Sequence, residues 1–441
     1  MPTLLLNLLL AVPSPLHEHH FRLDRPAEVV ATVTAGCDGC DWGARGREAA
    51  VLSLAVDGRY SQHLVLFRGG EADYRLLLGP LTPGEHRLSL SLDAGRSPRA
   101  IGPVRVAAVA VSPVVASHAE HEALAHAPIL HARRGSVERF TDVPLLAWVE
   151  TRLTGRGREL SYSVVFSHED GGTPADRLMA TWGRVTDIEL VYTVELDATG
   201  AVLREEYQGR DHVIEPFRGR KEGRHPVLYV VTKNNMVSDR GPATPRLAPA
   251  PIAFAPDGVS REAVMDAHPW TYRVSAQEVR REGRVAAAAA PGSKRIPDPR
   301  RFAYLEACGA VEDTRLAFEV GLLRGDRLAW LASDAGGADF RVGRSGCFRA
   351  AVALPPDRSV AEIRALRFRA HTRPPRRGER ALRRGSGWAR LERVNRLFGL
   401  GADDLPGPSL LSWSGPADLP PDGEAFEVPL GPSATGSDGV D

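Results

Sequence analysis

Short apolar runs with alternating polar residues recur along most of this chain, and they constrain its fold more than any other feature. Between residues 21 and 113, turns rich in Gly, Pro and Asp separate these runs. The runs cover residues 28–36, 49–58, 62–70, 74–81, 86–93 and 104–111. Short strands at such spacing are typical of an antiparallel sandwich. We therefore expect an N-terminal β-sandwich similar to immunoglobulin-like or jelly-roll modules.

The same pattern returns after residue 128 and predicts a second, larger domain. Residues 161–166 and 188–196 are strand-like, and further apolar runs start at Phe302. Residues 256–285 instead have helical character, with Ser260 as a candidate N-cap and a Gly at the end. We expect a mainly β protein, in which a larger antiparallel β-sandwich with one or two short helices follows the first sandwich.

The length of 441 residues exceeds what one hydrophobic core usually serves, so several domains are expected. The predicted segments are a signal-like stretch (1–20), a β-sandwich (21–113), a linker (114–128), a main β-domain (129–371) and a Pro-, Gly- and Arg-rich, partly disordered tail (372–441). Only three of the 56 basic residues in the chain are Lys. We therefore interpret the Arg run in the tail as a biased surface composition.

The segment TLLLNLLLAVPSP near the start resembles the hydrophobic region of a signal peptide, with a first strand or a disordered tail as the alternative. It is too short for a membrane helix, and no later run approaches the required length of about 20 residues. The net charge of +1 argues against a nucleic-acid partner. We expect a secreted or periplasmic protein without a transmembrane span. His17, Glu18, His19 and His20 are expected to be a mobile tail.

Four cysteines fit an oxidising compartment and allow three disulfide pairings, among which the sequence does not decide. Local pairing of Cys37 with Cys40, plus a bond between Cys308 and Cys347, is our preferred interpretation. Four thiolates could instead bind zinc, but the long gap and the lack of a second CxxC disfavour that reading. The CDGC segment has the character of a turn, which argues against a thioredoxin-like redox motif.

Acidic, amide and histidine side chains gather where the apolar runs of the main domain end. Asp187 and Glu189 lie two residues apart on one predicted strand, so both carboxylates can point the same way. Together with oxygen ligands from other segments they could bind a divalent cation, Ca²⁺ or Mg²⁺. The candidate metal ligands are Glu169, Asp170, Asp187, Glu189 and Asp239. The alternative is that acids on the polar face of a strand simply face water.

Further polar residues near this cluster could contact a ligand. They are His168, His225, Asn234, Asn235 and His268. The two residues His168 and His225 could also act as a general base. No GxSxG, HExxH, P-loop or GxGxxG motif is present in a suitable context. The catalytic residues, if there are any, stay unassigned.

The segment GRVTDIE at residues 183–189, followed by LVYTVEL and later by HPVLYVV, resembles the central region of the necrosis-inducing-like proteins. The resemblance extends over residues 183–231. It implies a secreted β-sandwich whose acidic positions contribute to a divalent-metal site facing membrane sphingolipid. Of the family heptapeptide, Gly183, Asp187 and Glu189 match. Arg184, Thr186 and Ile188 replace its two histidines and its tryptophan.

These features lead to three functional hypotheses. The first is a non-catalytic envelope or secreted protein whose acidic, metal-binding cleft binds a glycan or another oxygen-rich ligand. The second is a metal-assisted hydrolase or lyase that acts on polysaccharide. The third is a structural envelope protein without a site. The expected partner in the first two is a polysaccharide or a cell-envelope component.

Overall fold

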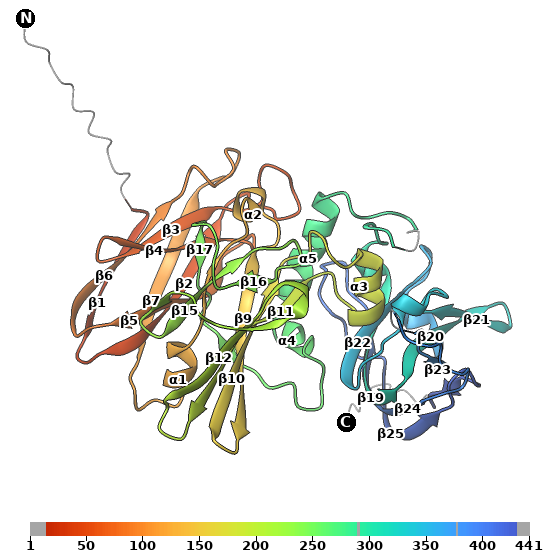
Figure 1. The fold of residues 1–441 in the computed structure, drawn as a ribbon. Coiled ribbons are helices and arrows are strands. Elements are labelled where there is room, and N and C mark those ends of the chain that lie inside the picture. The colour runs from red at the N-terminus through yellow and green to blue at the C-terminus, as the bar shows by residue number, and fades with distance from the viewer. Residues whose placement is uncertain (1–14, 289–291, 376–377, 430–441) are drawn as a thin grey trace, which may run out of the picture.

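The computed structural model describes residues 15–288, 292–375 and 378–429, and within these ranges the protein consists mainly of β-strands. Three pairs of sheets follow one another along the described chain, and Figure 1 shows them side by side from the N-terminal to the C-terminal region. The mainly β class and the sandwich-like arrangement are confirmed. Most of the signal-like stretch and the end of the predicted tail lie outside the described residues.

The first pair of sheets forms the expected N-terminal sandwich. One sheet has the strand order β1-β6-β3-β4 and the other the order β5-β2-β7, with antiparallel pairing throughout. The strands are β1 (His17–Leu23), β2 (Ala27–Cys37), β3 (Val51–Val56), β4 (Arg59–Val65), β5 (Ala72–Leu81), β6 (Gly84–Leu92) and β7 (Val104–Val114). Sequence alternation explains the packing: Leu88 and Leu90 of β6 are buried, whereas Ser89 between them is half-buried.

The expectation of a mobile tail at residues 17–20 is wrong. His17, Glu18, His19 and His20 belong to β1, whose backbone pairs with β6 along its whole length. The ring of His19 stacks on Phe21, and Phe21 stacks on His86 of β6. These ring contacts and the backbone pairing hold the segment on the sandwich.

The second pair of sheets forms the central region. Its larger sheet has the order β13-β12-β11-β10-β9-β18, and its smaller sheet has the order β14-β15-β8-β17, with β16 paired to β15. The strands are β8 (Ile129–His131), β9 (Pro144–Thr154), β10 (Gly157–Phe166), β11 (Asp187–Asp197), β12 (Val202–Gln208), β13 (Ile214–Pro216), β14 (Lys221–Glu222), β15 (His225–Val230), β16 (Val237–Ser238), β17 (Arg246–Leu247) and β18 (Ile252–Ala253). Two strand pairs depart from the antiparallel arrangement, because β15 runs parallel to β8 and β18 runs parallel to β9.

The α-helices of the described chain lie beside the central sheets. They are α1 (His121–Ala125), α2 (Ser136–Arg139), α3 (Ala175–Trp182), α4 (Ala263–Ala267) and α5 (Trp270–Arg281). Helices α4 and α5 occupy the expected region, but Ser260 does not cap α4, because its hydroxyl donates to Glu306 at 3.1 Å. Helix α3 was not expected, although Pro174 precedes it and Gly183, at φ 56°, ends it. Helix α1 lies in the segment predicted to be a linker.

The third pair of sheets forms a C-terminal sandwich. Its sheets have the orders β22-β19-β24-β25 and β21-β20-β23-β26. The strands are β19 (Phe302–Glu312), β20 (Thr314–Arg324), β21 (Arg327–Ala332), β22 (Gly346–Ala353), β23 (Ile363–Thr372), β24 (Trp388–Phe398), β25 (Leu411–Leu419) and β26 (Phe426–Glu427). The expectation of a tail from residue 372 is therefore wrong for β24, β25 and β26. Arginines of this sandwich form ion pairs, such as Arg369 with Glu319 of β20 and Arg396 with Asp266 of α4.

Buried side chains connect the three regions to one another. One apolar cluster joins Leu52 and Leu64 of the N-terminal sandwich to Val143 of the central region. Another joins Trp148 of β9 to Tyr304 of β19. In Figure 1, α3 and α5 lie between the central sheets and the C-terminal sandwich. No helix in the described part of the chain is long and apolar enough to span a membrane.

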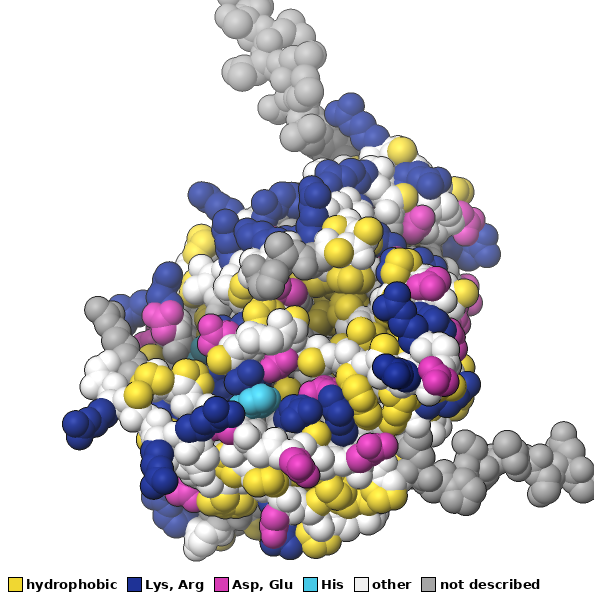
Figure 2. Space-filling view, turned by 90° about the vertical axis from the view of Figure 1, so that its right-hand side faces the viewer, with side chains coloured by type: hydrophobic (Ala, Val, Ile, Leu, Met, Phe, Trp, Pro, Cys, Tyr) yellow, Lys and Arg dark blue, Asp and Glu magenta, His cyan; other side chains and the backbone are white. Residues whose placement is uncertain are grey.

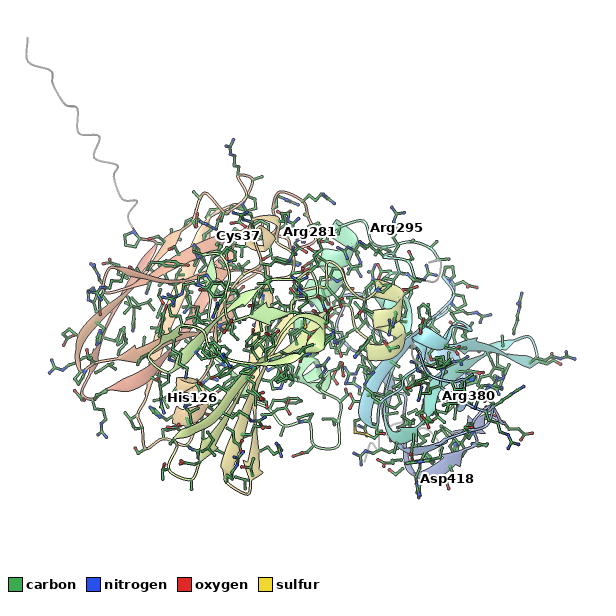
Figure 3. The ribbon with its side chains drawn as sticks, in the orientation of Figure 1. Cys37, His126, Arg281, Arg295, Arg380 and Asp418 are labelled. Carbon is green, nitrogen blue, oxygen red and sulfur yellow. A yellow bond between two sulfur atoms is a disulfide. The ribbon has the colours of Figure 1, made fainter. Side chains whose placement is uncertain are left out.

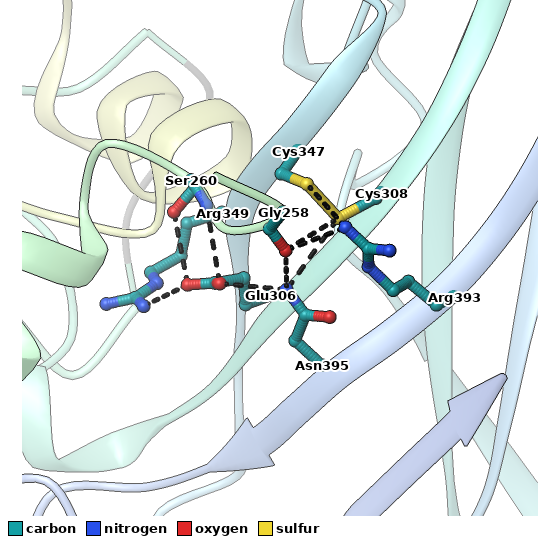
Figure 4. Close-up of a disulfide and its surroundings, with 8 residues drawn as sticks. All are labelled: Gly258, Ser260, Glu306, Cys308, Cys347, Arg349, Arg393 and Asn395. Atoms are coloured by element: carbon teal, nitrogen blue, oxygen red, sulfur yellow. Dashed lines mark hydrogen bonds and ion pairs between the residues drawn. A yellow bond between two sulfur atoms is a disulfide. The ribbon is translucent and has the colours of Figure 1, made fainter. Parts of the chain in front are cut away.

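The cysteines form the two preferred disulfides, Cys37–Cys40 and Cys308–Cys347, which excludes the zinc alternative. Cys308 of β19 and Cys347 of β22 lie directly opposite each other in the antiparallel pair. Figure 4 shows this disulfide beside the loop at Gly258, whose carbonyl oxygen accepts from Arg393 at 2.9 Å and from Asn395 at 3.0 Å. The bond therefore lies where the loop before α4 contacts the C-terminal sandwich.

Replacing both Cys308 and Cys347 by Ala is expected to lower the free energy of unfolding by about 4 kcal/mol, but replacing Cys37 and Cys40 by only about 2 kcal/mol. The two bonds span 39 and 3 residues of sequence, and a longer closed loop restricts the unfolded chain more. Urea unfolding of both double variants measures the difference. Equal losses, or a larger loss for the Cys37 and Cys40 variant, would contradict this explanation.

Candidate functional site

The predicted acidic cluster lies at one end of the central sheet. Strand β10 ends at Phe166, and the turn that follows carries His168, Glu169 and Asp170. Strand β11 begins at Asp187, which pairs with Phe166 in the antiparallel register. This pairing brings the turn after β10 next to the first residues of β11.

Asn235 connects the two segments. Its Nδ2 donates to the backbone oxygen of His168 and to Oδ2 of Asp187, both at 3.1 Å. The residue has φ 54°, in the left-handed region that Asn tolerates better than most side chains. Its Oδ1 is buried and has no hydrogen-bond partner among the described residues. Asn235 thus lies in the acidic cluster, where its amide bonds to the protein itself, and its role in ligand binding stays a prediction.

Three carboxyl groups are buried together in this cluster. Burial, and secondarily the charge of Asp187, raise the pKa of Glu169 to about 8 and that of Glu189 to about 10. Asp187 accepts from the backbone nitrogen of Ile188 at 3.0 Å and lies 3.6 Å from the Arg184 guanidinium. Glu169 and Glu189 are therefore mainly protonated near neutral pH, and they share the buried space with one carboxylate instead of repelling it.

This arrangement does not provide the solvent-facing acidic cleft that the sequence suggested. Glu169, Asp187 and Glu189 are all at most 6% exposed. In the described part of the chain, no group of three His, Cys, Asp or Glu side chains is placed to hold a metal ion. The alternation of β11 did predict that Asp187 and Glu189 share a direction, but both faces of the strand are covered at this end. The divalent cation stays a prediction without support from this geometry.

The pH dependence of stability tests the state of Glu189. An unfolded Glu loses its proton near pH 4.5, whereas folded Glu189 keeps it up to about pH 10. Between these values the folded state holds one extra proton, so this group makes the protein less stable as pH rises, by about 1.4 kcal/mol per pH unit. Glu189→Gln has no such proton to lose. We therefore expect the variant to gain stability relative to the wild type from pH 6 to pH 8.

Urea unfolding at pH 6, 7 and 8 measures this difference, and the exposed Glu424→Gln serves as the control. Groups with the opposite dependence, such as buried His126 with its pKa lowered to about 4, titrate alike in both proteins and cancel. A difference between wild type and Glu189→Gln that does not change with pH would show that Glu189 is ionised in the folded protein.

Three other predicted residues lie away from this cluster. His225 is buried between the N-terminal and central regions, where Nδ1 donates to the Ala127 oxygen at 2.9 Å and Nε2 lies 3.0 Å from Glu28. His268 lies beside Trp270, and burial lowers its pKa. Asp239 accepts from the backbone nitrogen of Arg218 at 3.0 Å. These residues stabilise separate local structures and do not join a common site.

Two further residues of the prediction lie beside the turn. Asn234 lies next to Gly172, where a Cβ atom would approach the Asn234 Cβ to 2.8 Å and would also meet the Glu169 carboxyl group. Gly172 has φ 122°, so this close approach depends on glycine. His168 is fully buried: Nδ1 donates to the Val185 oxygen at 2.8 Å, and Nε2 accepts from Arg284 at 2.6 Å. Burial and the Arg284 charge lower the pKa of His168, which keeps it neutral.

On the other side of the turn, Asp170 points into a polar cavity of about 570 Å³ that we call the basic junction pocket. Its lining comes from the N-terminal sandwich, the central region and the end of α5, and Figure 3 shows Arg281 at the end of this helix. The lining residues are Arg45, Glu48, Arg133, Arg139, Thr141, Asp170, Lys233, Arg281, Glu282 and Arg284. Six of these side chains are cationic and three are acidic, so the pocket has an excess of positive charge.

Two of the three acids in the pocket lining, Asp170 and Glu282, form ion pairs with Arg residues of the same lining. Asp170 accepts from Arg133, from Thr141 at 2.7 Å and from Arg284 at 3.1 Å. Although burial alone would raise the pKa of Asp170, the hydrogen bond from Thr141 and the charge of Arg133 lower it. Glu282 pairs with Arg284 at 2.7 Å. Asp170 therefore fixes the position of two guanidinium groups and is ionised at neutral pH.

Three cations of the pocket have no carboxylate within 4.0 Å among the described residues: Arg45, Lys233 and Arg281. Arg281 is held by carbonyl oxygens, since Nη1 donates to the Trp42 oxygen at 2.7 Å and Nη2 donates to the Phe140 oxygen. Its guanidinium also lies over the Trp42 ring at 5.0 Å. Fixed guanidinium groups without an acidic partner leave positive charge available to an anion.

Buried hydrogen bonds of Glu278 connect α5 to the N-terminal sandwich and to the central region beside the pocket. Glu278 of α5 accepts from Trp42 Nε1 at 3.1 Å and from the backbone nitrogen of Asp142 at 3.3 Å. Burial raises the pKa of Glu278 to about 7. Asp142 in turn accepts from Arg133 at 2.6 Å. The pocket is thus built on a rigid junction between the N-terminal sandwich, the central region and α5.

Comparison with known proteins does not assign this pocket. No model of a known protein family matches the chain, and no curated protein is similar to it in sequence. The resemblance of residues 183–231 to the necrosis-inducing-like proteins stays a prediction. The function must therefore be inferred from the geometry and charge of the site itself.

Proposed function

We propose that this protein binds an anionic, oxygen-rich ligand, an acidic polysaccharide, in the basic junction pocket. One observation carries the proposal: six cationic side chains and only three acids line a cavity of about 570 Å³. The ligand is still an oxygen-rich glycan, as the sequence suggested. The sequence suggested that acidic residues bind this ligand, whereas the proposed pocket would bind it through basic residues.

The pocket suits sulfate or carboxylate groups on a chain. Guanidinium groups present paired N–H donors that match the geometry of carboxylate, sulfate and phosphate oxygens. Arg139 and Lys233 lie at the exposed rim, whereas Arg281 and Arg133 lie deeper. Cations at two depths can contact successive anionic groups of a polymer. A single small anion would use only part of them.

Binding without turnover fits the lining better than catalysis. Thr141 donates its hydroxyl hydrogen to Asp170, and Asp170 is itself bound by two Arg residues. His168 adjoins the pocket only through Arg284, to which its Nε2 is bound. A general base needs a lone pair within reach of the substrate. The hydrolase and the structural-protein alternatives stay predictions that the following experiment separates.

Isothermal titration with dextran sulfate, polygalacturonate and neutral dextran tests the proposal. We expect binding of one or both polyanions, no binding of dextran, and an affinity that falls as salt is raised. The two polyanions distinguish sulfate from carboxylate recognition. Release of reducing ends from either would favour the hydrolase alternative. Absence of binding to both polyanions would contradict the proposed function.

A further inference from the structure

A second cavity lies apart from the basic junction pocket, between α3 and the C-terminal sandwich. It has a volume of about 530 Å³, and its walls come from α3, the start of β19, the end of β21 and the end of β22. Figure 2 looks onto this side of the molecule and shows hydrophobic side chains around a hollow in its upper half. Cavities of roughly 300–1,000 Å³ are typical of small-molecule sites.

The walls of this cavity are mainly apolar and include aromatic rings. Met179 of α3, Phe302 of β19, Trp330 of β21 and Phe340 contribute to the lining. The Trp330 ring is held from one side by Arg367, whose guanidinium lies 3.8 Å from the ring centroid. Because Arg367 is itself bound to Glu319 at 2.6 Å, this wall is preformed.

One cation, Arg301, lines the same cavity and lacks an acidic partner. No carboxylate of the described residues lies within 4.0 Å of its guanidinium. Its Nε is buried without a hydrogen-bond partner in the described residues, and Nη2 reaches the Leu354 oxygen only at 3.5 Å. That distance is longer than a normal N–H···O bond. A buried donor left unpaired costs free energy, which an acceptor on a ligand would recover.

We propose that this cavity binds a small amphipathic carboxylate, with the apolar body against the aromatic walls and the carboxylate on Arg301. Arg pairs with a carboxylate through two parallel hydrogen bonds, and an uncharged head group would make fewer and weaker ones. Asp176, the one acid of the lining, does not compete for Arg301. Its two oxygens accept from the backbone nitrogens of Arg177 at 2.8 Å and Gly292 at 2.7 Å.

Calorimetric titration of the full chain with decanoate and with decan-1-ol tests this proposal. We expect decanoate to bind more tightly than decan-1-ol. Arg301→Gln should weaken decanoate at least tenfold and change decan-1-ol little. Ala332→Phe, which fills the cavity, should weaken both. As a control, Arg327→Gln removes an exposed cation that lies on β21, the strand of Ala332, but does not line the cavity. This variant should bind both ligands as the wild type does.

The outcomes that overturn the proposal are distinct. If decanoate does not bind, or binds Ala332→Phe as tightly as the wild type, this cavity is not the site. If Arg301→Gln weakens both ligands equally, the carboxylate is not recognised by Arg301. If decanoate binding is lost only when Arg139 and Lys233 are changed to Glu, the ligand occupies the basic junction pocket. Thermal unfolding of each variant checks that it is folded.

Discussion

Replacing Arg349 by Met is expected to lower the free energy of unfolding by about 3–5 kcal/mol. Arg349 of β22 is 1% exposed, and its guanidinium bonds to Asp266 of α4 at 2.6 and 3.0 Å and also to Glu306 of β19. It donates to the Tyr272 hydroxyl of α5 as well. Figure 4 shows Arg349 and Glu306 with Ser260, at the contact between the helices and the C-terminal sandwich.

The effect is large because the substitution removes the partner of a buried acid, Glu306. Met fills much of the volume, but Glu306, which is 2% exposed, would lose the guanidinium that pairs with it. An unpaired buried charge is far more costly than the loss of an exposed ion pair. Arg324→Met, at an exposed position on β20, is the matched control and should change stability by less than about 0.5 kcal/mol. Similar losses in both variants on urea unfolding would contradict the structural role of Arg349.

The double substitution Arg139→Glu and Lys233→Glu is expected to weaken binding of the polyanion at least a hundredfold. Each hydrogen bond to a charged group contributes about 1.5–3 kcal/mol, and a tenfold change in affinity corresponds to about 1.4 kcal/mol. Both positions are exposed at the rim of the basic junction pocket, so the fold should tolerate the change. Introduced carboxylates also repel the ligand, which adds to the loss.

The matched control changes the same residue types at exposed positions that do not line the pocket. Arg99→Glu with Lys294→Glu gives the same change in net charge outside the pocket lining. We expect this control to weaken binding only slightly, through the general field of the protein. Calorimetric titration with dextran sulfate compares the two double variants. Equal losses of affinity would show that the polyanion responds to overall charge and not to this pocket.

The sequence predicted the fold class because strand alternation is a local property. Leu88 and Leu90 on β6 are buried as their spacing indicates. The sequence did not predict β24, because the many Arg residues obscure the alternation of apolar and polar side chains. Leu391, Val394 and Leu397 are nevertheless buried there. Long Arg side chains on the other positions reach solvent or acids, so a strand rich in Arg can still have an apolar face.

Of the residues that the sequence suggested for a site, only Asp170 lines the basic junction pocket. The order of strand ends correctly brought Asp187 and the turn at His168 together, because β10 and β11 pair with each other. Asn235, whose amide donates to Asp187, lies in a loop that local sequence patterns do not place. The cations Arg45 and Arg281 come from segments far apart in the chain. In a chain where almost every basic residue is Arg, no single one of them stood out.

The most direct test of the central claim is a crystal structure of the protein with a short sulfated oligosaccharide. We expect sulfate oxygens about 2.7–2.9 Å from nitrogen atoms of the basic junction pocket, with Arg139, Lys233 or Arg281 among the donors. An oligosaccharide bound elsewhere on the molecule, with this pocket filled only by water, would contradict the claim.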